Sequence, residues 1–129
     1  MHFWLVTFPL NSINKSRDAK ALNLINYLVR NNKKVLIYSD YPTNQKLKVL
    51  GIKGVDELYP KENSFLMLKP NSIILEKWFK KHNVNEKRIV YFGDDSDKDG
   101  IIAKKLSINY FNLSAFKHLR NKQWRNILK

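Results

Sequence analysis

Residues 88–100 read R-I-V-Y-F-G-D-D-S-D-K-D-G, and this stretch does most to indicate the fold. Its first part, Arg88–Phe92, is dominated by apolar and aromatic side chains, which is typical of a buried parallel strand. The part that follows, Gly93–Gly100, holds four aspartates between two glycines. Polar residues directly after a buried strand are characteristic of the ligand-binding edge of a parallel α/β sheet. We therefore expect a strand over 88–92 and a functional loop after it.

The rest of the chain alternates helical and strand patterns with short turns, which predicts βα units and a parallel sheet. A strand is predicted at Lys34–Ser39, and a helix with one apolar face at Asp18–Asn31. A long helix is predicted to open at Pro70-Asn71-Ser72, and its inner face is predicted to hold Ile73, Ile74, Leu75, Trp78 and Phe79. The other predicted elements are a helix over 43–50 capped by Thr43, a strand over 57–59, a helix over 101–106, a strand over 108–113 and a basic helix over 114–129.

The composition is that of one globular domain spanning residues 1–129. The hydrophobic fraction of 43% is sufficient for a buried core. The absence of cysteine excludes disulfides, thiolate metal sites and a cysteine nucleophile. No apolar run approaches the roughly 20 residues needed to cross a bilayer, and Met1–Leu10 lacks the features of a signal peptide. We therefore expect a cytoplasmic protein with no membrane partner.

The formal net charge of +13 admits two interpretations. A basic chain can bind nucleic acid, and Lys117–Arg125 has the spacing of a basic amphipathic helix. The lysines are spread along the chain, however, as a lysine-rich and asparagine-rich composition produces without selection for binding. We favour the second interpretation and expect no nucleic-acid partner. The positive field then serves to attract phosphorylated molecules.

Three places along the chain hold candidate chemistry. Ser39 and Asp40 follow the first buried strand, where a hydroxyl and free backbone N–H groups can hold phosphoryl oxygens. Lys69 precedes the helix that opens at Pro70 and can neutralise a phosphate charge. Asp94 and Asp95 follow the second buried strand, and crowded carboxylates of this kind favour a hard cation such as Mg²⁺.

The order of these features resembles the haloacid dehalogenase superfamily, in its phosphoglycolate-phosphatase-like form. The segment K-V-L-I-Y-S-D-Y-P-T-N-Q-K-L-K-V-L-G-I, residues 34–52, resembles the second family motif. Leu68–Pro70 resembles the third motif, and I-V-Y-F-G-D-D-S-D-K-D-G, residues 89–100, resembles the fourth. The resemblance covers about residues 18–113. It implies a Rossmann-like, three-layer α/β/α core with a mostly parallel sheet, and no cap domain is evident.

The resemblance also implies an activity. The family transfers phosphoryl groups through an aspartyl-phosphate intermediate with Mg²⁺ bound, so the expected function is hydrolysis of a small phosphorylated metabolite. By residue, Ser39 and Lys69 match catalytic positions, and Ser39, Asp40 and Lys69 would contact the phosphoryl group. Asp94 and Asp95 would hold Mg²⁺, and Asp99 would support the loop or Lys69. Lys69→Ala should then weaken binding of a phosphate analogue more than Lys46→Ala.

The first motif of the family, a strand ending in Asp-x-Asp-x-Thr, is absent, so the nucleophile is unknown. Two arrangements follow. Phe3–Phe8 (F-W-L-V-T-F) can serve as a degenerate first strand in the middle of the sheet, with Thr7 and Pro9 where the two aspartates belong. Alternatively, a companion segment supplies the strand, the chain is a truncated or split enzyme, and Phe3–Leu10 is the remnant of a cap or linker. We favour the second arrangement because Ser39 and the other matching residues are present.

Other functions remain open. With Phe3–Phe8 in the centre, the chain is a catalytically silent module that binds a phosphorylated ligand or a protein. Nucleic-acid binding through Lys117–Arg125 is a further alternative. A response-regulator receiver also has an acidic Mg²⁺ site on a parallel sheet, but its acidic pair belongs near its first strand, so it ranks lowest.

Overall fold

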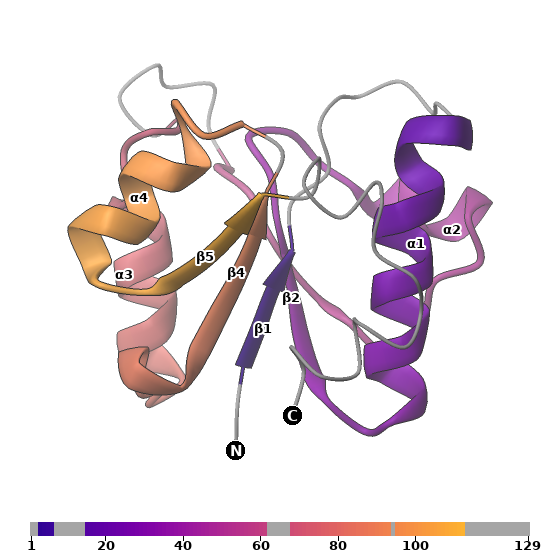
Figure 1. The fold of residues 1–129 in the computed structure, drawn as a ribbon, viewed down its shortest axis with the longest axis horizontal. Coiled ribbons are helices and arrows are strands. Elements are labelled where there is room, and N and C mark those ends of the chain that lie inside the picture. The colour runs from indigo at the N-terminus through magenta and orange to yellow at the C-terminus, as the bar shows by residue number, and fades with distance from the viewer. Residues whose placement is uncertain (1–2, 7–14, 62–67, 94, 113–129) are drawn as a thin grey trace.

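The structure, a computed structural model, describes residues 3–6, 15–61, 68–93 and 95–112, with side chains described from Leu22 onward. It is a mixed α/β fold with short parallel strands (Figure 1). In chain order its elements are β1 (Phe3–Val6), α1 (Lys15–Arg30), β2 (Lys34–Tyr38), α2 (Asn44–Val49), β3 (Asp56–Leu58), α3 (Ile73–Lys81), a short 3-10 helix (Glu86–Arg88), β4 (Ile89–Gly93), α4 (Asp99–Leu106) and β5 (Asn109–Asn112). Within the described residues, no helix has the length and apolar character that crossing a membrane requires.

The strands form one parallel sheet in the order β3-β2-β1-β4-β5. The first strand of the chain therefore lies in the middle, paired on one side with β2 and on the other with β4. Phe3 aligns with Lys34 and Ile89, and Val6 aligns with Ile37 and Phe92. The five strands of the described residues all run in the same direction, so the loops that follow β2 and β4 emerge at the same edge of the sheet.

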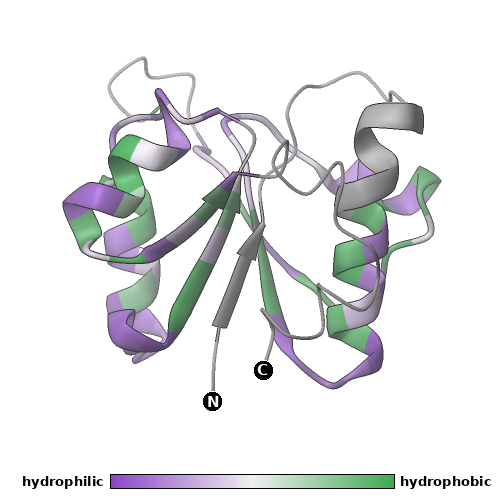
Figure 2. Ribbon diagram, in the orientation of Figure 1, coloured by the Kyte–Doolittle hydropathy of each residue, from purple (hydrophilic) through white to green (hydrophobic). Residues whose placement is uncertain are grey.

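Alternation along the strands divides the core between the two faces of the sheet. On β2, Val35 and Ile37 pack on the face covered by α1 and α2, whereas Leu36 and Tyr38 pack on the face covered by α3 and α4. Successive side chains of a strand point to opposite faces, which produces this division. Figure 2 shows the same pattern, since the helices present hydrophobic residues toward the sheet and hydrophilic ones away from it. Tyr91 of β4 shares the α3–α4 face with Tyr38.

The middle of the sheet is filled by residues near the start of the printed sequence. Of the two arrangements expected for this position, the one with Phe3–Phe8 as first strand agrees with the observed β1 at Phe3–Val6. A companion strand, as the favoured expectation required, would have to displace β1 from both β2 and β4. Thr7 and Pro9, which follow β1 in sequence, lie outside the described residues.

Most of the predicted elements are present, with differences at their ends. The helix predicted over 101–106 begins two residues earlier, at Asp99, because the last aspartate of the loop occupies the first helical turn. Thr43 occupies the N-cap position of α2, but its side chain makes no capping hydrogen bond. Leu75 and Phe79 of α3 are buried as predicted, whereas Ile73, predicted on the same face, is 40% exposed. The predicted basic helix over 114–129 lies outside the described residues.

Candidate functional site

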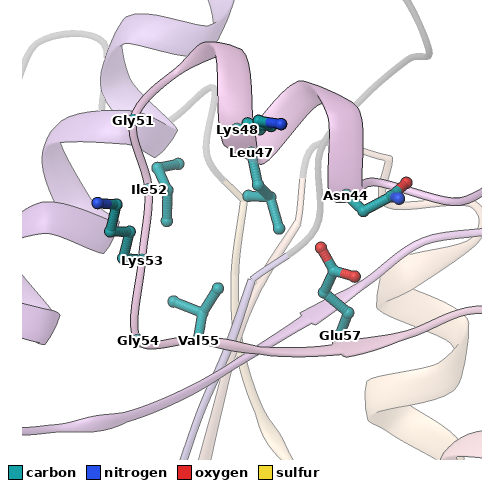
Figure 3. A pocket seen from close by; sticks show the side chains of 9 residues that line it. All are labelled: Asn44, Leu47, Lys48, Gly51, Ile52, Lys53, Gly54, Val55 and Glu57. Atoms are coloured by element: carbon teal, nitrogen blue, oxygen red, sulfur yellow. The ribbon is translucent and has the colours of Figure 1, made fainter.

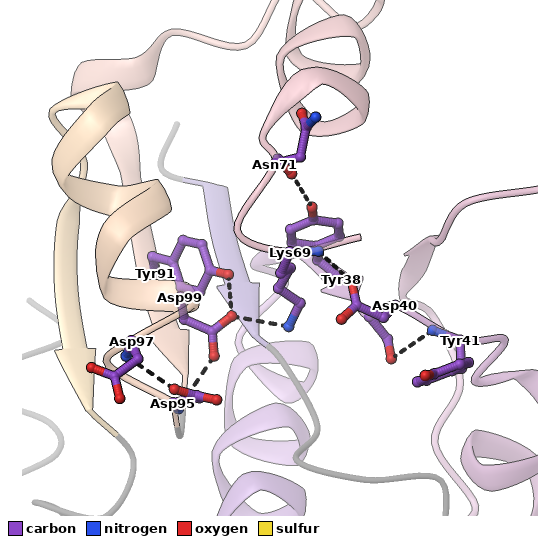
Figure 4. Close-up of polar contacts among 10 residues, drawn as sticks. Tyr38, Asp40, Tyr41, Lys69, Asn71, Tyr91, Asp95, Asp97 and Asp99 are labelled. Atoms are coloured by element: carbon purple, nitrogen blue, oxygen red, sulfur yellow. Dashed lines mark hydrogen bonds and ion pairs between the residues drawn. The ribbon is translucent and has the colours of Figure 1, made fainter. Parts of the chain in front are cut away.

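The described residues of the predicted site lie at the carboxyl edge of the sheet, and Figure 4 shows Asp40, Lys69, Asp95 and Asp99 gathered there. Ser39 and Asp40 follow β2, and Asp99 opens α4 after β4. Lys69 lies on the segment that leads into α3 through a cis Lys69–Pro70 peptide bond. Three separate connections of the fold thus converge on one place, as their position at the ends of parallel strands predicts.

At the centre of the site is an ion pair between Lys69 and Asp99. The ammonium nitrogen of Lys69 lies 2.9 Å from Oδ1 of Asp99, and the two side chains are 8% and 1% exposed. Burying two opposite charges carries a desolvation cost, which only close geometry and further hydrogen bonds can offset. Asp99 has such bonds, because its carboxylate also accepts hydrogen bonds from the Tyr91 hydroxyl and the Asp95 backbone N–H. The aspartate is therefore held from three directions.

Two buried tyrosines flank the ion pair. The Tyr91 hydroxyl donates a 2.6 Å hydrogen bond to Oδ1 of Asp99, while the ring of Tyr38 lies 5.2 Å from the Lys69 ammonium. Burial raises the pKa of Tyr91 well above its ordinary value, and the neighbouring charge of Asp99 raises it further. Burial also raises the pKa of Tyr38, with smaller contributions from the charges of Asp40 and Asp99. Both phenols are therefore neutral at physiological pH and serve as donors.

The loop after β2 is tied directly to Lys69. Oδ1 of Asp40 accepts a 2.8 Å hydrogen bond from the backbone N–H of Lys69, so the end of β2 is joined to the segment before α3. Ser39 is 8% exposed, and its Oγ accepts a 3.3 Å hydrogen bond from the backbone N–H of Tyr41. That bond uses an oxygen lone pair of Ser39 and not its hydroxyl proton. The Asp40 carboxylate has a positioning contact, and its expected role at a phosphate stays a prediction.

The acidic loop after β4 is folded on itself. Oδ1 of Asp95 accepts a 2.9 Å hydrogen bond from the backbone N–H of Asp97, and its carbonyl accepts one from the backbone N–H of Asp99. Asp94, the other expected magnesium ligand, lies outside the described residues. Within the part of the chain that the structure describes, no three side chains of the metal-binding kind gather at one point. Asp95 offers carboxylate oxygens, which are the ligand atoms that Mg²⁺ prefers. Proteins usually bind Mg²⁺ through one or two carboxylates.

Gly93 lets Asp99 approach the end of β4. A Cβ atom at Gly93 would lie 2.6 Å from Oδ2 and 2.7 Å from Cγ of Asp99. Such contacts are far shorter than atoms tolerate, so a side chain here would push Asp99 away from Lys69. The close approach of Asp99 therefore requires glycine at position 93 of the predicted fourth motif.

Sequence reasoning missed the two tyrosines of the site. Tyr38 and Tyr91 were treated as ordinary members of buried strands, K-V-L-I-Y-S and R-I-V-Y-F. The signal was a phenol in an otherwise aliphatic or aromatic run, since a buried hydroxyl requires a hydrogen-bond partner. The partners, Asp99 for Tyr91 and the Asn71 carbonyl for Tyr38, lie on other elements and are not adjacent in sequence.

A separate hollow of about 240 Å³ lies beside the edge strand β3 (Figure 3). Leu47, Ile52 and Val55 form its apolar part, and the Glu57 carboxylate and the Asn44 amide lie at its rim. None of its lining residues belongs to the predicted site, so the hollow and the Lys69–Asp99 pair are different features of the molecule.

No protein-family model matches the chain, and no curated protein matches it. The likeness to the haloacid dehalogenase superfamily therefore depends on the three sequence motifs described above. Membership of that superfamily is a proposal.

Proposed function

We propose that the chain is a haloacid-dehalogenase-like module that holds a phosphorylated small molecule at the carboxyl edge of its sheet and does not hydrolyse it. The observation that carries the proposal is the position of β1. Phe3–Val6 pairs with both β2 and β4, which is where the resembled family has its nucleophile strand, and residues 3–9 contain no aspartate. Without that carboxylate no aspartyl-phosphate can form.

The residues that remain are suited to binding. An ammonium group has three N–H donors, and Asp99 accepts one from Lys69. In the proposal, the other two donate to phosphoryl oxygens together with the Ser39 hydroxyl. The Asp40 carboxylate would repel a phosphate. We therefore propose that Asp40 acts indirectly, by fixing the backbone of the loop. The net charge of +13 favours the approach of an anionic ligand.

Magnesium fits this proposal as a counter-ion. Asp94 and Asp95 are the residues that would hold it, and the ion would offset the charge of a phosphoryl group beside them. Asp95→Ala should then lower Mg²⁺ affinity, whereas Asp97→Ala should change it less, because Asp97 was not assigned as a ligand. Titration calorimetry with MgCl₂ measures both variants, and equal affinities in the two would contradict the assignment.

A charge-matched pair of variants tests phosphate binding. Lys69→Met should weaken the binding of inorganic phosphate by about tenfold or more, because it removes a charge-assisted donor. Lys53→Met lowers the net charge equally at an exposed lysine and should change the affinity less than about twofold. Lys46 does not serve as the surface control, because it is only 7% exposed. Equal losses of phosphate affinity in Lys69→Met and Lys53→Met would mean that Lys69 acts only through the overall positive charge of the chain.

The second candidate function is the Mg²⁺-dependent phosphohydrolase completed by a companion segment. The specific observation in its favour is the buried Lys69–Asp99 pair, which a purely structural domain does not require. Incubation of the chain with an aryl phosphate and Mg²⁺ tests whether it hydrolyses a phosphate ester without a companion segment. We expect no hydrolysis by the chain and none by Asp94→Asn. Hydrolysis that disappears in Asp94→Asn would establish the enzyme and exclude the silent module.

A further inference from the structure

We propose that Tyr91 is a positioning residue of the site, whose hydroxyl fixes the Asp99 carboxylate that in turn fixes the Lys69 ammonium. The inference deepens the proposed function, since it concerns how the phosphate-binding lysine is held. Its physical basis is a contact pattern among buried groups that come from β4, from α4 and from the segment before α3.

The contact pattern centres on one oxygen atom. Oδ1 of Asp99 accepts both the 2.6 Å hydrogen bond from the Tyr91 hydroxyl and the 2.9 Å hydrogen bond from Lys69. The first distance is at the short end for hydroxyl donors, as expected when the acceptor is charged. Because Tyr91 belongs to β4 in the interior of the sheet, it connects the ion pair to a rigid element. Lys69 itself lies on a loop segment, where Asp40 holds its backbone N–H and Asp99 holds its ammonium group.

Packing alone does not require the hydroxyl. Tyr91 is 0% exposed and its ring lies 5.6 Å from that of Tyr110 in an edge-to-face contact, which phenylalanine would make equally well. A phenol in this interior is unfavourable unless it is hydrogen-bonded, and the bond that it makes is to the charged partner of Lys69. The raised pKa of Tyr91 keeps the proton on the phenol, so the hydroxyl remains the donor.

A double-mutant cycle on phosphate affinity tests whether Tyr91 acts through Lys69. The four chains are the wild type, Tyr91→Phe, Lys69→Met and the double variant, titrated with inorganic phosphate. We expect Tyr91→Phe to lower the affinity by about fivefold to tenfold in the wild type and by less than about twofold beside Lys69→Met. Tyr110→Phe, the same substitution on the neighbouring ring, should stay within about twofold of the wild type. Equal losses from Tyr91→Phe with and without Lys69 would overturn the proposal.

Two measurements without any ligand keep this test separate from that of the proposed function. The first is a proton resonance of the Tyr91 hydroxyl, protected from exchange, which should be absent in Tyr91→Phe, present in Tyr110→Phe and shifted in Lys69→Met. The second is the same cycle measured on the free energy of unfolding, which should be non-additive. If phosphate does not bind but both results are obtained, the proposed function fails and the positioning role stands. Additive unfolding energies, or a resonance unaffected by Lys69→Met, would refute the positioning role.

Discussion

Among single residues, the buried Lys69–Asp99 pair is expected to have a large effect on the free energy of unfolding. Both side chains are more than nine-tenths buried, so water stabilises neither charge well. Each charge is stabilised by the opposite charge of its partner. Removing one partner leaves an uncompensated charge, whereas removing both leaves a cavity that apolar side chains can fill.

Lys69→Met alone, or Asp99→Leu alone, should therefore destabilise the fold by about 3–5 kcal/mol. The double variant Lys69→Met/Asp99→Leu should be more stable than either single variant, because no buried charge is left without a partner. Urea unfolding followed by circular dichroism gives the three free energies. A double variant as unstable as the sum of the two single ones would mean that the charges do not interact strongly.

Two glycines near the same loop differ in what a methyl group would meet. Gly93→Ala should destabilise by about 1–3 kcal/mol and weaken phosphate binding, because its Cβ would lie 2.6 Å from Oδ2 of Asp99. Gly100→Ala, inside α4, has its nearest contact at 3.6 Å and should be neutral or stabilising. Thermal unfolding of the two variants compares them directly. Similar melting temperatures for both would show that Asp99 moves away from Gly93 without cost.

At the scale of elements, the sequence predicted the strongly patterned segments closely. The apolar runs at β2 and β4 predicted the ends of both strands to within a residue. A short continuous apolar run between turn residues is typical of a buried strand. The same reasoning located Lys69 and Asp99 near one sheet edge, where the structure joins them. It did not locate the Tyr91 contact, since the partner of a buried hydroxyl is a tertiary property.

The central strand was the hardest element to assign from sequence. β1 has four residues, and a short apolar run does not by itself specify a strand, still less its place in a sheet. Its location is set by pairing with segments that are remote in the sequence, Lys34–Tyr38 and Ile89–Gly93. The motifs alone were therefore compatible with a companion strand, which was favoured, as well as with β1.

Proline substitution tests the place of β1. Leu5→Pro should abolish cooperative unfolding, because it removes a backbone donor and strains a strand that is paired on both sides. Asn109→Pro, at the first residue of the edge strand β5, should be tolerated better. Denaturant unfolding of both variants provides the measurement. If Leu5→Pro is as stable as Asn109→Pro, β1 does not hold the middle of the sheet in solution.

At the scale of the whole molecule, the two buried tyrosines influence stability at high pH. A phenol whose pKa is raised by folding holds its proton more tightly in the folded chain. Its contribution to stability is complete below its ordinary value of 10.0 and is lost as the pH rises from there through the folded-state pKa.

The wild type should therefore lose stability above about pH 10 more steeply than a Tyr38→Phe/Tyr91→Phe variant, which has no buried phenol at these positions. Unfolding free energies measured from about pH 8 to 11 give the two slopes. The absorbance of tyrosinate supplies an independent check, since Tyr38 and Tyr91 should ionise only on unfolding. Parallel slopes would show that neither phenol is protected.

The central place of β1 also bears on how the chain is made. During synthesis Phe3–Val6 leaves the ribosome before either of its neighbours, because β2 follows only at Lys34 and β4 only at Ile89. A nascent chain that has produced residues up to β3 can pair β1 along one side alone, and its other side stays open until β4 emerges. An open strand edge is a template for pairing with other chains. Until β4 has been synthesised, the open side of β1 is thus a place where a nascent chain can pair with another chain.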